Sequence, residues 1–271
     1  MNKLERTYFL KKRDLVFCIS IMAGILLIFK IPVHLLFQSA VLEPFSGYFN
    51  KIIISLIIIG GCWLMAKKYG IHIFIRRITG NGNMYWMLLL PLFFPGLLLI
   101  SGFSLDCHDS ILIGFFFFFS FIISGVTEEI VFRGLIQGYL TKKYPRKTNN
   151  QICIITSFLF ALIHFNNIQY NELSDVINQM IYAFYMGLLF SALMIRIGNT
   201  LLVGIAHGLL NTLSINCVIK EPNASNILVQ RSDLTILAQV VGMVLILSPT
   251  LLIYWFLLSG IKQKKDMENA G

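Results

Sequence analysis

The chain has 271 residues, of which 56% are hydrophobic and only 13% are charged, and its mean hydropathy is +0.75. Soluble domains carry about a quarter charged residues, so this composition excludes a water-soluble globular protein. A formal net charge of +9 would suggest a nucleic-acid partner in a soluble chain, but here the basic residues follow a membrane topology, and we expect no nucleic acid.

Apolar runs of membrane length recur along the whole chain. In order they cover residues 15–37, 48–66, 84–104, 111–140, 151–168, 177–195, 200–218 and 235–260. Between them we find no soluble segment, no low-complexity region and no internal repeat. The sequence therefore predicts an all-α polytopic membrane protein. We expect a bundle of about eight transmembrane helices in a single membrane domain, residues 1–271, surrounded by the lipid bilayer.

The lysines and arginines fall on alternate connections between these runs. One side receives 17 of the 22, whereas Arg133 lies inside a run. The other side holds only Lys30, Lys51, Lys220 and Arg231. By the positive-inside rule, both termini of this multi-pass protein of the cell membrane lie in the cytoplasm. The abundance of Ile, Asn and Lys favours an AT-rich bacterial source.

The first three runs contain few polar residues. Residues 15–37 follow a basic segment, as the core of a secretory signal does, but the run is too long and predicts an uncleaved first span. Pro91 and Pro95 predict a bend in the third run. No catalytic pattern is evident in the first hundred residues.

The fourth run contains two adjacent acids and an arginine, Glu128, Glu129 and Arg133. Ionisable groups inside an apolar span are costly, and a functional site is the default hypothesis for them. Glu129 and Arg133 are i,i+4 neighbours and can pair, whereas Glu128 points about 100° away from Glu129. A structural ion pair between helices is the alternative, but it needs only one of the two acids. We therefore expect one carboxylate to be held by Arg133 and the other to face a cavity.

Two later runs add polar residues at a similar depth. The fifth contains His164, with Phe160 on the same helical face, and the seventh contains His207 and Asn211 on one face. With a rise of 1.5 Å per residue, Glu128, both histidines and Asn211 lie within about 8 Å of the membrane midplane. Taken singly, each histidine is more simply a hydrogen-bonded packing residue. Taken together, these residues predict an active site inside the bundle.

Two chemistries suit this set of residues. In the first, a glutamate acts as general base on a water that a histidine orients, and Asn211 or the second histidine stabilises the oxyanion. In the second, two histidines and a glutamate (His164, His207 and Glu128) bind zinc and leave a fourth position for water. Both chemistries hydrolyse a peptide bond. The chain contains no H-E-x-x-H pair and no Ser or Cys nucleophile with the usual flanking residues.

The three motifs resemble those of the CPBP family of intramembrane proteases, also called the Abi family, which includes CAAX proteases and bacteriocin-processing enzymes. They read E-E-x-x-x-R at residues 128–133, F-x-x-x-H at 160–164 and H-x-x-x-N at 207–211. The resemblance covers about residues 111–218 and implies that this part is the catalytic core.

The resemblance also implies a role for each motif residue. Glu128 and His164 activate the water. Glu129 and Arg133, with Phe160, support the site. His207 and Asn211 bind the oxyanion or position the substrate.

The family has been described both as metalloproteases and as metal-independent glutamate proteases. Because no standard zinc motif is present, we favour a mechanism that requires no cofactor, with zinc as the alternative. The implied function is an intramembrane endopeptidase acting on a membrane-associated peptide or protein, in bacterial peptide processing, signalling or bacteriocin immunity. A non-catalytic scaffold or immunity protein that modulates a sensor or secretion component is the main alternative. A transporter is a weaker one, because no repeat with broken helices is evident.

Overall fold

A computed structural model of the chain describes residues 10–31, 45–75, 85–91, 111–145, 148–213 and 236–259. Its α-helices are α1 (Lys12–Phe29), α2 (Ser46–Tyr69), α4 (Ile111–Glu129), α5 (Gln137–Lys143), α6 (Asn149–Ile163), α7 (Leu173–Ile197), α8 (Thr200–Leu213), α9 (Ile236–Leu247) and α10 (Pro249–Leu258). The described residues also form three short helical segments of other types. The segments η4 (Tyr85–Leu89) and η6 (His164–Gln169) are 3₁₀-helices, and η5 (Ile130–Ile136) is a π-helix. Within the described ranges the chain forms no β-strand, which confirms the all-α prediction.

Several helices are long and apolar enough to cross a membrane. Four of them cover Ser46–Tyr69, Gly114–Lys143, Asn149–Gln169 and Leu173–Ile197. Helices α9 and α10 form a further candidate span that is bent by 43°, and α8 is a shorter apolar helix. The multi-pass membrane architecture is therefore confirmed. The expected number of about eight spans stays a prediction, since most of the run 84–104 lies outside the described residues.

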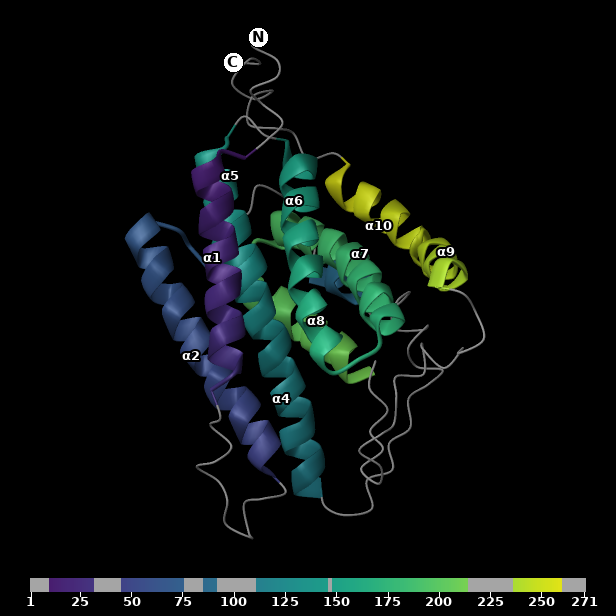
Figure 1. Cartoon of the computed structure of the whole chain (residues 1–271). Helices are drawn as coiled ribbons and strands as arrows, with labels where there is room; N and C mark the ends of the chain where they lie inside the picture. Colours follow the sequence, from purple (N-terminus) through teal and green to yellow (C-terminus); the bar gives the residue numbers. More distant parts are fainter. Residues whose placement is uncertain are drawn as a thin grey trace, which may run out of the picture.

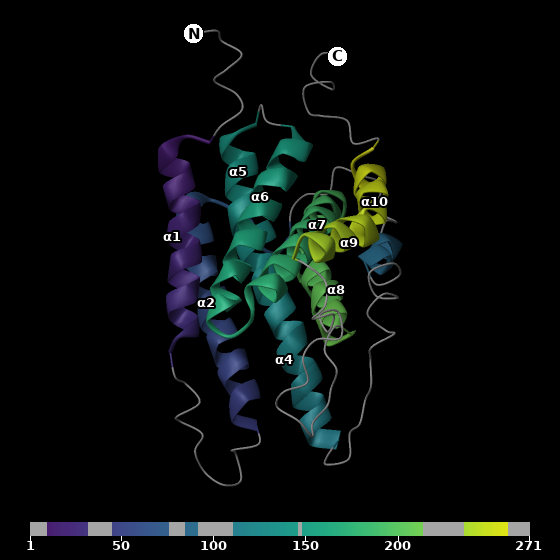
Figure 2. The same cartoon turned by 45° about the vertical axis from the view of Figure 1, so that its right-hand side comes forward.

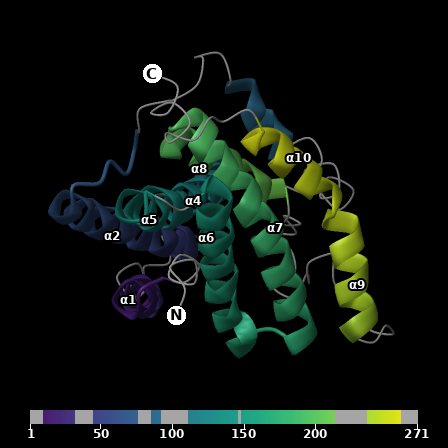
Figure 3. The ribbon, with the colours of Figure 1, turned by 90° about the horizontal axis from the view of Figure 1, so that it is seen from above.

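The centre of the bundle is formed by α4, α6, α7 and α8 (Figures 1 and 2). Helix α4 packs most extensively against α8, and α6 against α7. Seen from above, α1 and α2 lie on one side of this group and α9 and α10 on the other (Figure 3). The segment η5, which continues α4, contacts α6, α7 and α8. The acidic motif is therefore enclosed by the helices that carry the two histidine motifs.

A tight turn returns the chain from α7 into α8. Gly198 ends α7 with a positive φ of 67°, in the left-handed conformation that glycine adopts most easily. The side chain of Asn199 then accepts hydrogen bonds from the backbone N–H groups of Leu201 and Leu202, at 3.1 and 3.2 Å. These bonds satisfy two of the free N–H groups at the start of α8. The turn thereby fixes where α8, and with it His207, begins.

Three glycines allow α4 and α8 to cross in close contact. A Cβ atom on Gly125 of α4 would lie 2.4 Å from the backbone nitrogen of Gly208. Cβ atoms on Gly204 and Gly208 of α8 would lie 2.6 Å from the Cα of Val126 and 2.4 Å from the Cα of Ile122. No side chain fits at these three positions, so the two backbones touch. Small residues spaced four apart commonly mediate such close packing between membrane helices.

The start of α1 is tied to α5 by a buried acid. Asp14 accepts hydrogen bonds from the hydroxyl of Tyr139, at 2.8 Å, and from the hydroxyl of Tyr144, and it pairs with the ammonium of Lys143. Burial raises the pKa of the Asp14 carboxyl, but these three partners outweigh it and hold the pKa below its ordinary value. The carboxylate is therefore ionised at neutral pH and fastens α1 to the bundle at one end.

Candidate active site

The two adjacent glutamates lie in different environments. Glu129 is completely buried, and its Oε1 accepts hydrogen bonds from Arg133, at 3.0 Å, and from Nδ1 of His207, at 2.8 Å. The side chain of Glu128 is 30% exposed, and among the described residues it accepts one long hydrogen bond, at 3.4 Å from the hydroxyl of Ser124. Successive helical residues point about 100° apart, which explains the division. Glu129 is held in place, and Glu128 is accessible.

Arg133 connects the acidic motif to two other helices. Its guanidinium donates one hydrogen bond to Glu129 and another to the backbone carbonyl of Gly187 in α7, at 3.0 Å. The guanidinium carbon also lies 4.6 Å from the centre of the Phe160 ring in α6. A buried charge is tolerated only when its partners are in place. The i,i+4 pair expected from the sequence is present, and it is part of a larger network.

The π-helical segment η5 begins directly after Glu129 and contains Arg133. Such wider turns are rare interruptions of α-helices and are frequently found at functional sites. Gly134, in the same segment, packs so closely that a Cβ atom would lie 2.8 Å from the carbonyl oxygen of Ile73. The sequence does not predict the π-helix, because nothing in these seven residues distinguishes it from an α-helix.

His207 lies between the two carboxylates. A carboxylate oxygen only accepts hydrogen bonds, so Nδ1 of His207 donates to Glu129. Nε2 then lies 3.7 Å from Oε2 of Glu128, beyond hydrogen-bond distance. The imidazole is nearly buried and stacks on the ring of Phe190, with a centroid distance of 4.6 Å. This packing fixes the ring where it joins α8 to the acidic motif.

His164 begins the 3₁₀ segment η6 at the end of α6. Its Nδ1 lies 2.9 Å from the backbone carbonyl of Phe160. Because a carbonyl oxygen accepts, Nδ1 carries the proton in the neutral ring and Nε2 has a free lone pair. The ring also packs edge-on against Phe160, with a centroid distance of 4.9 Å. These contacts orient His164 with Nε2 available as an acceptor.

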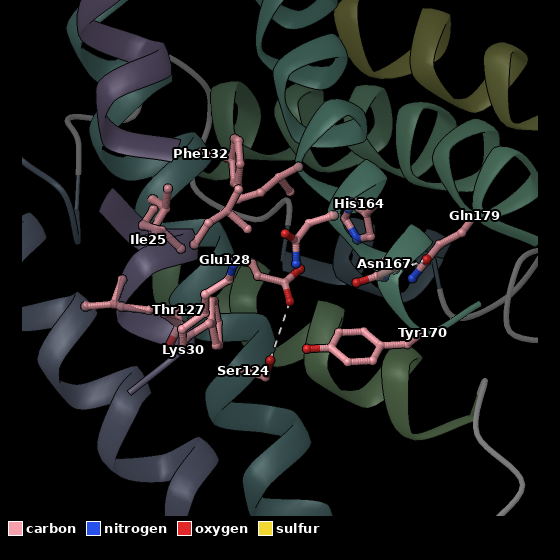
Figure 4. Close-up of a pocket in the computed structure, with 16 residues that line it drawn as sticks. Ile25, Lys30, Ser124, Thr127, Glu128, Phe132, His164, Asn167, Tyr170 and Gln179 are labelled. Atoms are coloured by element: carbon pink, nitrogen blue, oxygen red, sulfur yellow. Dashed lines mark hydrogen bonds between the residues drawn. The ribbon is translucent and has the colours of Figure 1, made fainter. Parts of the chain in front are cut away.

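Glu128 and His164 line the same cavity, of about 410 Å³ (Figure 4). Its apolar wall consists of Ile25, Leu26, Phe29, Ile58, Val131, Phe132 and Ile163. Its other polar residues are Lys30, Ser124, Thr127, Asn166, Asn167, Tyr170 and Gln179. An apolar wall combined with convergent polar groups is typical of a site for a small ligand or peptide. In the view of Figure 4, Glu128 lies between Thr127 on one side and Tyr170 on the other.

The site brings together most of the residues that the sequence analysis selected. Glu128 and His164 line the cavity, while Glu129, Arg133 and His207 form the buried network behind them. The ring of Phe160 contacts Arg133 and both histidines. Asn211, one turn after His207 in α8, is half-buried and does not line this cavity. The oxyanion role expected for His207 and Asn211 stays a prediction.

The expected zinc ligands were Glu128, His164 and His207. Among the described residues, no group of three or more His, Cys, Asp or Glu side chains is arranged to hold a metal ion. His207 uses Nδ1 for Glu129, and its Nε2 lies 3.7 Å from Oε2 of Glu128. The zinc alternative stays a prediction, and no step below involves a metal.

Two groups of residues at the site or beside it were not predicted from the sequence. The first is the polar lining contributed by α1, η6 and α7, whose residues belong to no motif. The second is the glycine contact between α4 and α8. Here a signal was present, because Gly204 and Gly208 form a G-x-x-x-G pattern in an apolar helix. The pattern indicates a close helix contact, although it does not name the partner helix.

Comparison with known proteins agrees with this geometry. Residues 109–213 match the protein family described as type II CAAX prenyl endopeptidase Rce1-like. This segment contains all three motifs and the helices α4 to α8. No curated protein matches the chain. Residues 109–213 are therefore similar to the Rce1-like family, which confirms the resemblance of this segment to the CPBP and CAAX intramembrane proteases.

Proposed function

We propose that the chain is an intramembrane endopeptidase that hydrolyses a membrane-associated peptide or protein with a water activated by Glu128 and His164. The observation that carries this proposal is the division of the two acids. Glu129 is buried against Arg133 and His207, whereas Glu128 shares a cavity with His164. A purely structural ion pair would leave the second acid without a function. The Rce1-like match supports the same class of activity.

The geometry of His164 supports a specific way to hold the water. Nε2 of His164 and the carboxylate of Glu128 are both hydrogen-bond acceptors. A water bound between them donates one hydrogen to each, which leaves an oxygen lone pair free to attack a carbonyl carbon. Holding the nucleophile in this orientation lowers the entropic part of the barrier.

In the proposed reaction, the water oxygen forms a bond to the carbonyl carbon while Glu128 takes one proton. The tetrahedral intermediate then breaks its C–N bond, and the proton passes from Glu128 to the leaving amine. The products are a carboxylic acid and an amine, and Glu128 returns to its starting state. General-base catalysis of this kind contributes about 10²- to 10⁴-fold. We propose that Asn211 and His207 stabilise the oxyanion, with His207 carrying a second proton on Nε2 because its Nδ1 proton is donated to Glu129, and that no cofactor is needed.

We further propose a bacterial cell-membrane protein with both termini in the cytoplasm, acting in peptide processing, signalling or bacteriocin immunity. The distribution of Lys and Arg supports this orientation. The alternative is a non-catalytic scaffold, whose function depends on the fold but not on peptide hydrolysis. Replacement of Glu128 distinguishes them, because a scaffold does not depend on a carboxylate in a cavity.

The test is peptidomics on membranes and medium from a deletion strain complemented with the wild-type chain, Glu128→Gln or His164→Ala. We expect one or more peptides to mature only with the wild type. Expression of each variant at the wild-type level in the membrane is the control. If both variants restore every peptide and the strain's phenotype, the protein acts as a scaffold and the proteolytic proposal is wrong.

A further inference from the structure

The cavity contains one cationic side chain among its described lining residues, Lys30. We propose that Lys30 binds a carboxylate of the substrate and so selects peptides that carry one near the cleaved bond. This inference rests on the proposed function, since it names a specificity residue for that reaction. The carboxylate is either the free C-terminus of the substrate or an Asp or Glu side chain, because both present the same chemistry to an ammonium group.

Lys30 reaches the cavity from the end of α1. It is the residue that ends this helix, and Ile25, Leu26 and Phe29 in the preceding turn form part of the apolar wall. Among the described residues, no side-chain hydrogen bond or ion pair involves Lys30, although Glu128 lines the same cavity. The ammonium is thus available to a ligand. Helix α1 contributes both an apolar surface and a charge to the cavity.

Two ordinary explanations account for a lysine at this position. A cation at the C-terminus of a helix interacts favourably with the helix dipole. A lysine near the end of a membrane helix also extends towards lipid headgroups. Neither explanation requires the side chain to line a cavity that also contains the proposed general base. The shared cavity is the observation that favours a ligand.

The remaining polar residues divide the cavity into two ends. Asn166, Asn167, Tyr170 and Gln179 come from η6, the residue after it, and α7, and all are uncharged. The amide of Asn167 donates to the side-chain oxygen of Gln179 at 2.8 Å. In Figure 4, Lys30 lies with Thr127 on one side of Glu128, and Asn167, Tyr170 and Gln179 lie on the other.

This arrangement suits a peptide that crosses the cavity past Glu128. Neutral amides and hydroxyls can hydrogen-bond to peptide groups but do not neutralise an anion. Glu128 repels a second carboxylate, so a negative group of the substrate is stable only at the Lys30 end. An extended peptide advances about 3.3 Å per residue, so a carboxylate a few residues from the cleaved bond would reach that end.

The test uses the full-length protein in liposomes and one library of lipid-anchored peptides synthesised twice, with C-terminal carboxylates and with C-terminal amides. Each cleaved sequence is also made with its Asp and Glu residues replaced by Asn and Gln. We expect neutralising one carboxylate to raise KM about 10-fold for the wild type, with little change in kcat. Lys30→Gln should remove this preference, and Lys30→Arg should largely restore it.

Lys12→Gln is the matched control, because Lys12 is exposed at the opposite end of α1 and does not line the cavity. It should retain the preference for carboxylates. Loss of cleavage on amidation identifies the C-terminal carboxylate, whereas loss on Asp or Glu replacement identifies a side chain, and either supports the proposal. The proposal is wrong if the wild type cleaves the carboxylate and neutralised versions of each peptide equally well. It is also wrong if Lys30→Gln loses the same fraction of activity on every version. If the wild type cleaves no peptide, the proposed function itself fails.

Discussion

Nδ1 of His207 donates a hydrogen bond to Oε1 of Glu129 at 2.8 Å, across the crossing of α8 and α4. The same oxygen accepts from Arg133, so one buried carboxylate joins the first and third sequence motifs. Glu128, the preceding residue in the chain, takes no part in these two bonds. The adjacent acids therefore have separable effects on stability and on activity.

Exchange of each glutamate for glutamine tests this separation. Glu128→Gln should lower the rate of peptide hydrolysis about 10²- to 10⁴-fold and leave the melting temperature nearly unchanged. Glu129→Gln removes the negative charge opposite the buried Arg133 and should destabilise the protein by about 3–5 kcal/mol. Hydrolysis rates and thermal unfolding of both variants in the same detergent provide the measurement. Equal losses of stability in the two variants would contradict the separation.

Arg133 should not tolerate replacement by lysine. Its two terminal nitrogens reach Glu129 and the carbonyl of Gly187, each at 3.0 Å. A lysine carries its charge at a single point and cannot reproduce the planar fork, so one buried acceptor loses its partner. We expect Arg133→Lys to lower the free energy of unfolding by about 1–3 kcal/mol and to reduce activity. Arg13→Lys, on the exposed start of α1, is the matched control, and a similar loss in that variant would show that the effect is not specific.

The close contact between α4 and α8 at their glycines predicts that glycine-to-alanine substitutions have very different effects inside this contact and outside it. In Gly208→Ala the new Cβ would meet the Cα of Ile122 at 2.4 Å, so α4 and α8 must separate. This change displaces His207 from Glu129 and should lower both the yield of folded protein and its activity. Folded yield by size-exclusion chromatography and the hydrolysis rate measure the effect.

Gly242→Ala in α9 is the control, because a Cβ there meets no atom of the described residues within 4 Å. Alanine is the better helix former, so this variant should be as stable as the wild type or more stable, by up to about 1 kcal/mol. A folded and active Gly208→Ala protein would show that the close crossing is not needed to align the site.

The sequence predicted the local part of the site and missed the contacts between distant residues. The Glu129–Arg133 pair follows from i,i+4 spacing on one helix, so a pattern in the chain was sufficient. The contact of His207 with Glu129 joins residues 78 positions apart, and it depends on how α8 crosses α4. Depth in the membrane indicated that the histidines and acids lie at one level. It did not indicate which histidine faces the cavity and which lies behind it.

The lining of the cavity by α1 could not be predicted for a similar reason. Lys30 looks like an ordinary basic residue at the end of a span, and only the packing of α1 against the bundle brings it near Glu128. The π-helical turn at η5 also cannot be predicted from the sequence, because most of its residues are apolar, as in the preceding helix. Tertiary packing determines both features.

The attachment of α1 through Asp14 predicts a dependence of stability on pH. Because the pKa of Asp14 is lower in the folded protein than its unfolded value of about 3.9, its ionisation stabilises the fold at and above that pH. This stabilisation is lost as the pH falls through the folded pKa. Asp14→Asn should therefore be less stable than the wild type at pH 7, by about 1–3 kcal/mol, and the difference should shrink below about pH 4.

Unfolding free energies of both proteins between pH 3 and 7 measure this dependence. Lys142→Met is the control, because Lys142 donates to the carbonyls of Tyr69 and Gly70 rather than to Asp14. Its difference from the wild type should stay constant over the same range. A difference between wild type and Asp14→Asn that is equally constant would mean that the carboxylate is not ionised in the fold. In that case hydrogen bonds alone, without the ion pair to Lys143, would attach α1 to α5.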